Sequence, residues 1–373
     1  MVAGPSKSSS LQGTTHLHSR IPPTVPADAS LVSVVVVSFN GRDLLPDCLA
    51  SLCRQTYRHH EVIVVDNGSS DGSAEWLHKH YPSVRVVALP SNRGFAGGTN
   101  AGIRVARGGF VATINNDVRV EPNWIEEMVR TAQRGRGVGM VASKVLFVRA
   151  PSVVDSAGLC IDRVGMAWHR LGGSYDDGSA SEHEVFGPCA GAALYRRELF
   201  DDVGYFDEDF FCYLEDVDLA WRARQAGWRC VYTPRACAYH LHSATAVEDS
   251  PFKRFHLGRN KVWLIAKNFP APEVWFYLPL ILAYDLAGVM ATLLMGGDGR
   301  PIRNRLAGIA GRLAGMAAMK PVLAKRQALH EVRRVAGWRV LSQMGGIPGP
   351  LSTYRRYAHL YRSGEFDNGA SIK

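Results

Sequence analysis

Apolar and polar residues follow one another in blocks along the first third of the chain. Apolar runs rich in Val occupy residues 31–39, 61–66, 84–89 and 110–114, and stretches with helical periodicity separate them. Continuous β-branched runs are typical of strands buried on both faces of a parallel sheet. Strands that alternate with helices predict right-handed crossovers and a ligand site at the carboxyl edge of the sheet. We therefore expect an α/β fold with a mixed, mainly parallel sheet flanked by helices.

The pattern becomes irregular beyond about residue 139, where short strand-like pieces surround a Gly-rich patch at 172–173. We expect this mixed region to cover the cleft. A helix is predicted over 213–226, ended by Gly227, and a strand-like run follows at 228–233.

Residues 1–30 are rich in Ser, Thr and Pro and contain no apolar stretch of the kind found in a secretory signal, so they are predicted to be a disordered tail. The whole chain has 373 residues, of which 46% are apolar and 21% charged, which excludes global disorder. Its seven Cys form no CxxC pair, so neither a disulfide framework nor a zinc ribbon is indicated and a reducing, cytosolic compartment fits best.

Positive charge is concentrated in the last third of the chain. Residues 251–373 hold 19 Lys and Arg against 6 Asp and Glu, whereas the first 250 residues are slightly acidic. The same region contains an apolar run at 274–295, long enough to cross a bilayer but interrupted by Pro279 and Asp285. Insertion as a span is energetically marginal, so an in-plane or re-entrant helix on an anionic membrane is favoured. The alternative is a buried core helix.

Nucleic acid would also be attracted by this charge, but no aromatic and basic recognition motif accompanies it, so nucleic-acid binding is not expected. A second segment, 306–323, mixes apolar residues with Arg312 and Lys320 and is consistent with an interfacial amphipathic helix.

Short polar side chains gather where three of the predicted strands end, and parallel strands bring such ends to one crevice. They are Ser38, Asn40, Asp66, Asn67, Asn115, Asn116 and Asp117. Carboxylates that accept from ribose or base, together with loop amides that hold phosphate, suit a nucleotide. The alternative is that these residues only form the hydrogen bonds of ordinary turns, in which Asn, Asp and Ser are common. The Gly-rich stretch 97–102 does not follow the first strand, so a nicotinamide-dependent dehydrogenase is weakly supported, and no P-loop is present.

The helix predicted over 213–226 offers three acids with different prospects. Asp218 has Arg222 four residues later, which favours a structural ion pair. Asp216 has only apolar residues at that spacing, so no basic neighbour on its own helix neutralises it, and it is free to act as a base. The third acid is Glu215. The alternative for all three is that they form a solvated acidic end of the helix with no catalytic role.

These segments together resemble the inverting glycosyltransferases of family 2, which have the GT-A (Rossmann-like) fold. The resemblance covers about residues 32–268. It rests on VSVVVVSFNG, EVIVVDNGSSDGS, SNRGFAGGTNAGI, INNDV in place of the family's DxD, FFCYLEDVDL in place of its ED motif, and GRNKVWLIAKNFP. Within the family the chain looks most similar to bacterial rhamnosyltransferase-like members.

The resemblance implies a UDP- or dTDP-sugar donor, held by the strand-end residues named above and by a further group on the Gly-rich loop and helix. That group is Asn92, Arg93, Gly94 and Asn100. Asp117 and a histidine, His240 rather than its neighbour His242, would hold a divalent cation, manganese or magnesium, on the diphosphate. Asn115 replaces the first Asp of a full DxD, which removes one hard anionic ligand and predicts weaker metal binding. A metal-independent reaction is the alternative.

The same resemblance assigns Asp216 as the catalytic base, with Glu215 contacting the acceptor or supporting the site. Arg259, in a recurrent Arg-Asn pair with Asn260, would stabilise the diphosphate, and a basic interfacial helix is the alternative for it.

We therefore expect three regions: the tail 1–30, a GT-A domain over 31–268 and a helical, basic and apolar membrane-associating extension over 269–373. The expected function is inverting transfer of a sugar, with rhamnose as a candidate, to a lipid-linked or polysaccharide acceptor of the cell surface. The expected place is the cytoplasmic face of the plasma membrane. A non-catalytic nucleotide- or glycan-binding membrane adaptor that keeps the fold is the alternative, motivated by the missing Asp at position 115.

Overall fold

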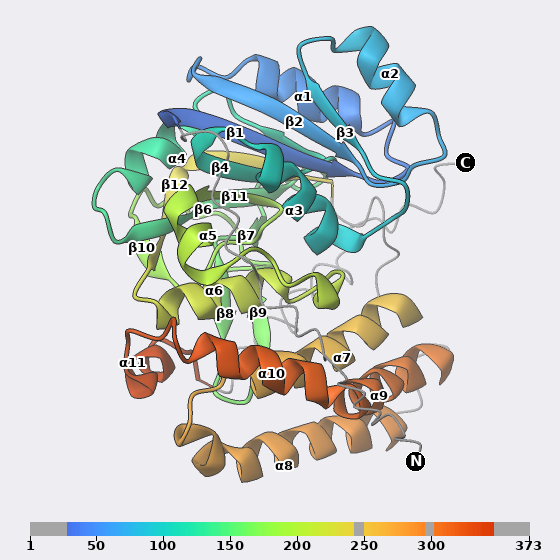
Figure 1. The fold of residues 1–373 in the computed structure, drawn as a ribbon, viewed down its shortest axis with the longest axis vertical. Helices are drawn as coiled ribbons and strands as arrows, with labels where there is room; N and C mark the ends of the chain where they lie inside the picture. Colours follow the sequence, from blue (N-terminus) through green and yellow to red (C-terminus); the bar gives the residue numbers. More distant parts are fainter. Residues whose placement is uncertain (1–27, 242–249, 295–301, 347–373) are drawn as a thin grey trace, which may run out of the picture.

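The computed structural model describes residues 28–241, 250–294 and 302–346. Figure 1 shows a twisted sheet with helices on its faces at one end and a layer of helices at the other. The expected tail lies outside the described residues except for its last three, which begin the first strand. His242 also lies outside them.

Four parallel strands form one half of the main sheet, in the order β4, β1, β2, β3. Their bounds are β1 (Asp28–Ser38), β2 (His60–Asp66), β3 (Arg85–Ala88) and β4 (Gly108–Asn115). The helices between them are α1 (Leu45–Cys53), α2 (Ser73–His80) and α3 (Gly94–Val105). The predicted alternation of parallel strands and helices is confirmed.

The other half of the sheet is mixed, as expected for the region beyond residue 139. β11 (Ala192–Arg196) lies antiparallel between β4 and β6 (Val138–Phe147), and β12 (Arg229–His240) runs parallel to β6. Short strands complete it: β5 (Val118–Val120), β7 (Val154–Ser156) and β10 (His183–Val185), with β8 (Leu159–Ile161) and β9 (Ala167–His169) as a separate hairpin. The helices here are α4 (Trp124–Ala132), α5 (Arg197–Val203) and α6 (Glu215–Gln225).

Two apolar clusters occupy the two faces of the main sheet. Val32, Val34 and Val36 of β1 face α1 and α4, whereas Val35 faces α3 and the mixed region. This division follows from the twofold periodicity of a strand, which sends successive side chains to opposite faces. Because both faces are covered, the strand is apolar throughout its central part, which explains the run seen in the sequence.

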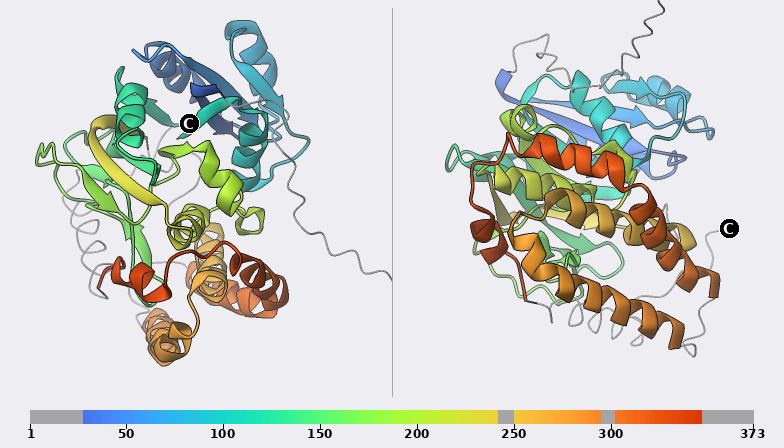
Figure 2. Two further views of the ribbon diagram at one scale, coloured as in Figure 1. Left: turned by 60° about the vertical axis from the view of Figure 1, so that its left-hand side comes forward. Right: turned by 60° about the horizontal axis from the view of Figure 1, so that its bottom comes forward.

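The C-terminal helices form a layer below the sheet, which Figure 2 shows from the side of that layer. They are α7 (Pro251–Asn268), α8 (Glu273–Leu294), α9 (Ile302–Ala317), α10 (Met319–Leu329) and α11 (Gly337–Ser342). The segment expected as one amphipathic helix, 306–323, is in fact divided at Ala318, and α9 and α10 meet at a bend of 63°. α7 packs against α9 and α10 and also contacts α6, so this layer is joined to the sheet domain through α7.

Candidate active site

The ends of β1, β2 and β4 lie side by side because these strands are paired in register. Ser38 stands opposite Asp66 across the β1 and β2 pair, and Asn115 stands opposite Val37 on the other side of β1. Ser38 and Asp66 are buried. The structure therefore brings the predicted strand-end residues to one edge of the sheet.

The loop after β2 crosses this edge and uses two of the predicted residues as anchors. The Asn40 side-chain oxygen accepts from the N–H of Ser70 at 2.9 Å, and one carboxylate oxygen of Asp66 accepts from the N–H of Ser69 at 3.0 Å. Turn chemistry thus occupies part of the hydrogen-bonding capacity of both side chains. The other oxygen of the Asp66 carboxylate has no such turn contact among the described residues.

Asn67 connects the end of β2 to the start of α3. Its side-chain oxygen accepts from the N–H of Arg93 at 2.9 Å, and its amide nitrogen donates to Asn92 and to the carbonyl of Gly94. Gly94 has a φ of 70°, and a Cβ there would lie 2.3 Å from the carbonyl oxygen of Phe211. Only glycine fits both this backbone conformation and this close approach.

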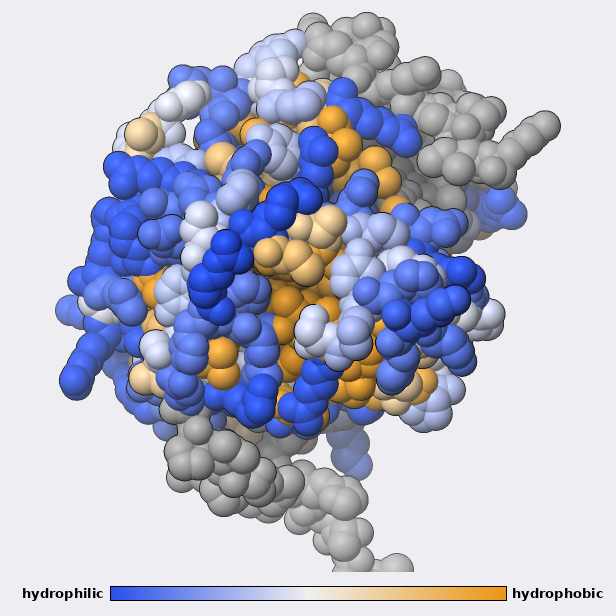
Figure 3. All heavy atoms as spheres, turned by 90° about the horizontal axis from the view of Figure 1, so that it is seen from above, coloured by the Kyte–Doolittle hydropathy of each residue, from blue (hydrophilic) through white to orange (hydrophobic). Residues whose placement is uncertain are grey.

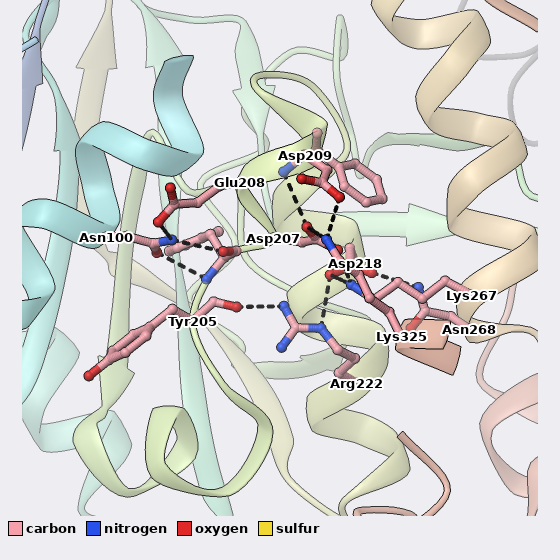
Figure 4. A network of polar contacts seen from close by, with 12 residues as sticks. Asn100, Tyr205, Asp207, Glu208, Asp209, Asp218, Arg222, Lys267, Asn268 and Lys325 are labelled. Carbon is pink, nitrogen blue, oxygen red and sulfur yellow. Dashed lines mark hydrogen bonds and ion pairs between the residues drawn. The ribbon is translucent and has the colours of Figure 1, made fainter. Parts of the chain in front are cut away.

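Asn100 is not brought to the strand ends. Its amide nitrogen donates to the carbonyl of Phe206 at 2.8 Å and to the carboxylate of Glu208 at 3.0 Å, and its oxygen accepts from the N–H of Phe206. Figure 4 shows the side chain directed into this contact. Both ends of the amide are therefore engaged in holding the segment before α6 against α3.

The last residue of β4, Asn115, and the two that follow it, Asn116 and Asp117, point to different neighbours. Asn116 donates to the Ser38 hydroxyl at 3.1 Å, and the Asn115 side chain lies against Gly191. One carboxylate oxygen of Asp117 lies 3.3 Å from Nε2 of His240, at the end of β12. Strand pairing brings Asp117 and His240 together, because His240 of β12 stands opposite Val118 of β5, the residue after Asp117.

Asp155 is a functional candidate that no pattern in the sequence indicates. Asp155 is the middle residue of β7, and its carboxylate is buried. The carboxylate lies 2.6 Å from Nδ1 of His240 and 3.4 Å from Nδ1 of His169 on β9. Burial opposes the charge on His240, but hydrogen bonds to Asp117 and Asp155 prevail and raise the pKa of His240 to about 10. Asp155 belongs to no motif at a recognisable spacing, so only the fold reveals it.

Asp216 lies in the first turn of α6, where the helix dipole favours a negative charge. Its carboxylate accepts from the N–H of Val217 at 2.8 Å and from the N–H of Ala190 at 3.3 Å. Burial raises the pKa of Asp216, and the nearby His169 lowers it in part. A raised pKa brings a carboxylate closer to the range in which it can act as a general base.

His169 extends the contacts at the end of β12 toward α6. It lies beside Asp155, which holds His240 and through it Asp117. These four ionisable side chains form a series of contacts from the end of β4 to β9, and the charge of His169 also lowers the pKa of Asp216.

Glu215 is more deeply buried than Asp216, with 6% of its surface exposed. Burial, followed by the charges of Asp216 and Asp218, raises the pKa of Glu215 well above its ordinary value. One of its carboxylate oxygens has no hydrogen-bond partner within the described part of the chain. A protonated Glu215 can donate as well as accept a hydrogen bond.

Asp218 serves the structure, as the sequence predicted. Arg222 donates to its carboxylate at 2.9 Å, and Lys267 and Asn268 of α7 reach the same carboxylate at 2.9 and 2.7 Å. Figure 4 shows these groups meeting between α6 and α7. Burial acts against the charge, but Lys267 and Arg222 outweigh it and lower the pKa of Asp218.

Arg259 is turned to the backbone that precedes α6. It donates to the carbonyls of Asp209 and Phe210, each at 2.9 Å, and its guanidinium lies 4.3 Å from the ring centre of Trp263. Burial lowers its pKa. In this arrangement Arg259 supports the segment before α6.

Comparison with known proteins agrees with this geometry. The family model described as "Glycosyl transferase family 2" matches residues 33–204. An N-acetylglucosaminyl-diphospho-decaprenol L-rhamnosyltransferase of Mycobacterium tuberculosis is 30% identical over 248 residues, which cover 59% of this chain and 79% of that protein. The chain belongs to glycosyl transferase family 2. It is accordingly a glycosyltransferase, which disfavours the alternative of a non-catalytic adaptor.

Other relatives of this family 2 chain are much longer than it is. An uncharacterized protein of Sinorhizobium fredii is 34% identical over 61% of the chain, and the O-antigen biosynthesis protein RfbC of Myxococcus xanthus is 31% identical over 59% of it. The chain matches only 26% and 18% of their respective lengths. Among solved structures, GalNAc-T7 with UDP, GalNAc and Mn2+ superposes with a TM-score of 0.54 at 15% identity, over 69% of this chain and 50% of that one. The fold is GT-A.

Proposed function

We propose that this glycosyltransferase moves a sugar from a UDP- or dTDP-sugar, with inversion at the anomeric carbon, to a lipid-linked or polysaccharide acceptor. The observation that carries the proposal is the series of contacts through Asp117, His240, Asp155 and His169, together with Asp216 in the first turn of α6 as the candidate base. Rhamnose is a candidate sugar, since the relative from Mycobacterium tuberculosis is named a rhamnosyltransferase.

The nucleoside end of the donor would lie at the edge formed by β1, β2 and β4. Asp66 and the strand-end amides supply acceptors and donors for ribose and base, and the loop from Asn92 to Gly94 leads into the start of α3 beside them. The N–H groups of Arg93 and Gly94 are held by Asn67 and Asn92, so the attraction for phosphate there comes from the positive end of the helix dipole. Asn100 would act indirectly, through the segment it holds.

Asp117 and His240 would hold a divalent cation together with the diphosphate. Nε2 of His240 lies 3.3 Å from the Asp117 carboxylate and would release its proton when the cation binds, while Asp155 holds the other ring nitrogen, which is the arrangement that orients a metal-bound histidine. Within residues 28–241, 250–294 and 302–346, no three or more His, Cys, Asp and Glu side chains are grouped to hold a metal by themselves. Manganese or magnesium fits such a pair, because these cations take further ligands from phosphate and water. The cation would neutralise charge on the leaving diphosphate.

Asp216 would take the proton from the acceptor hydroxyl while that oxygen bonds to the anomeric carbon. The bond from this carbon to the diphosphate oxygen breaks on the opposite face, and the electron pair leaves with the diphosphate. One displacement inverts the configuration. Glu215 would support the acceptor or Asp216, and Arg259 would act on the backbone before α6.

The helices after the GT-A domain of residues 31–268, α8 to α11, would place the enzyme on the cytoplasmic face of the plasma membrane, and we propose them as its membrane-associating extension. α8 is the one helix of the described residues that is long and apolar enough to cross a membrane by itself. Its outward face is apolar, with Trp275 and Phe276 exposed to 71% and 80%. Figure 3 shows the opposite end of the molecule, which is mostly hydrophilic.

α8 would lie in the plane of an anionic membrane rather than cross it. Asp285, on its inner side, lies 2.7 Å from Lys261 of α7 and 3.4 Å from Arg312 of α9, so the charge that opposes lipid contact is paired within the protein. The exposure of the outer face disfavours the alternative of a buried core helix.

The proposal is tested with purified protein, labelled UDP- and dTDP-sugars and lipid extract as acceptor. We expect transfer from one donor with the inverted anomeric configuration by NMR. Asp216→Asn keeps the volume of the side chain and should bind nucleotide normally while turnover falls by about 10²- to 10⁴-fold. Binding without turnover by the unaltered protein would instead indicate the adaptor, and near-normal transfer by Asp216→Asn would exclude Asp216 as the base.

A further inference from the structure

The segment that leads into α6 has an unusual backbone. This entry segment, residues 209–214, contains three residues other than glycine with positive φ: Phe211 at 64°, Tyr213 at 68° and Leu214 at 67°. Left-handed backbone is unfavourable for side chains with a Cβ, above all for large ones. Such a conformation persists only where surrounding contacts impose it, and it is often found at functional sites.

Asn260 of α7 supplies these contacts. Its side-chain nitrogen lies 3.0, 2.9 and 2.7 Å from the carbonyl oxygens of Phe210, Cys212 and Tyr213, and its two hydrogens are shared among these three acceptors. The residue is completely buried, and its side-chain oxygen accepts from Nε of Arg259 at 2.9 Å. One amide therefore gathers three carbonyls of a short, left-handed stretch around a single point.

Two further residues of α7 hold the same segment. Arg259 donates to the carbonyls of Asp209 and Phe210, and the His256 ring stacks on Phe211 with ring centres 5.6 Å apart. The entry segment is thus fixed along most of its length by one helix, α7, at the end of the proposed GT-A domain.

The entry segment also touches the donor side. The carbonyl of Phe211 accepts from the N–H of Ala96 at 3.1 Å, in the first turn of α3, and it lies against Gly94. At the other end of the segment, the carbonyl of Leu214 accepts from the N–H of Asp218, and this hydrogen bond closes the first turn of α6. The segment consequently spans from the proposed phosphate loop to the turn that carries Asp216.

We propose that Asn260 is a positioning residue, which holds the entry segment in its left-handed conformation and so sets Asp216 relative to the donor loop. This inference rests on the proposed role of Asp216. Misplacement of a catalytic group by about 1 Å can cost about 10²-fold in rate, so a backbone clamp at this place has a large effect on turnover.

The test compares Asn260→Ala with Lys261→Met, the next residue on α7, which is also buried but pairs with Asp285 on the other side. We expect Asn260→Ala to lower kcat by about 10- to 100-fold with little change in the Kd for nucleotide, because the donor residues remain in place. Lys261→Met should leave kcat near normal. Equal kcat losses in both variants would show a general packing effect and overturn the inference.

A second variant separates positioning from stability. Leu214→Gly adopts positive φ without strain, so in the Asn260→Ala background it should recover part of the lost kcat even though it adds no contact. If Asn260→Ala does not fold, Asn260→Ser, which keeps one donor in the same space, replaces it with the same expectation. Absence of rescue, or a normal kcat in the Asn260 variants, would refute the clamp. Normal activity of Asp216→Asn would instead refute the base, whatever Asn260 does.

Discussion

Nδ1 of His240 lies 2.6 Å from a carboxylate oxygen of Asp155, a residue 85 positions earlier in the chain. The other ring nitrogen faces Asp117. A histidine held in this way presents a fixed nitrogen to whatever binds beside Asp117, and the first prediction follows from this contact.

Asp155→Asn should weaken cation binding by about 10- to 100-fold, because a carboxylate that orients a metal-bound histidine also increases its basicity. Manganese binding in the presence of UDP, followed by EPR, measures the change directly. Asp162→Asn is the matched control, since Asp162 is equally buried but, among the described residues, its side chain accepts from backbone N–H groups such as those of Val164 and Met166 and contacts no histidine. Unchanged manganese affinity in Asp155→Asn would contradict the proposed role of this contact.

Asn115→Asp should lower the cation concentration needed for half-maximal activity, because it restores a hard anionic ligand near Asp117. Asp117→Ala and His240→Ala should each raise it. Titration of activity with manganese and magnesium measures all three variants. Full activity of the unaltered enzyme in excess chelator would remove the cation from the mechanism.

The pH dependence of kcat should show an acid limb above the ordinary Asp pKa of 3.8, because burial raises the pKa of Asp216 and only the ionised form accepts a proton. Activity is therefore lost as the pH falls through this raised value. The raised pKa also means that ionised Asp216 lowers stability at neutral pH, so Asp216→Asn should raise the Tm. A lower Tm for this variant would indicate that the carboxylate stabilises the fold.

Lys267→Met should lower the free energy of unfolding by about 1 to 3 kcal/mol, because it removes the lysine shared by two buried carboxylates, which keep Arg222 and Lys325 as partners. Lys267 lies 2.6 Å from Asp207 and 2.9 Å from Asp218. Since the pKa of Asp218 is lowered, its contribution is present above the unfolded pKa and is lost as the pH falls below it. Urea unfolding at neutral and acid pH checks both statements, and Arg334→Ala, at an exposed pair, should cost far less.

Trp275→Asp combined with Phe276→Asp should reduce binding to anionic vesicles while leaving donor binding unchanged, because both side chains point away from the protein. High salt should release part of the unaltered protein by screening the basic residues. Sedimentation with vesicles of phosphatidylglycerol and phosphatidylcholine measures both effects. Unchanged sedimentation of the double variant would show that α8 is not the lipid contact.

Local pattern was sufficient for several features of this protein. The β-branched runs and the short polar residues that end them defined the parallel strands and their common edge, because strand periodicity and right-handed crossovers leave few alternatives. The spacing of Asp218 and Arg222 likewise predicted their ion pair, since a helix brings residues four apart together. Motif order alone indicated the family.

Tertiary structure decided which of these side chains meet. Asp155 joins His240 only because β7 and β12 both pair with β6, and Asn100 turns to Glu208 because the segment before α6 packs on α3. Arg259 and Asn260 were visible as a motif, but their carbonyl partners lie about fifty residues earlier, in a backbone conformation that no local propensity favours. Contacts between distant segments depend on how elements pack, and a single sequence encodes that packing only through the fold as a whole.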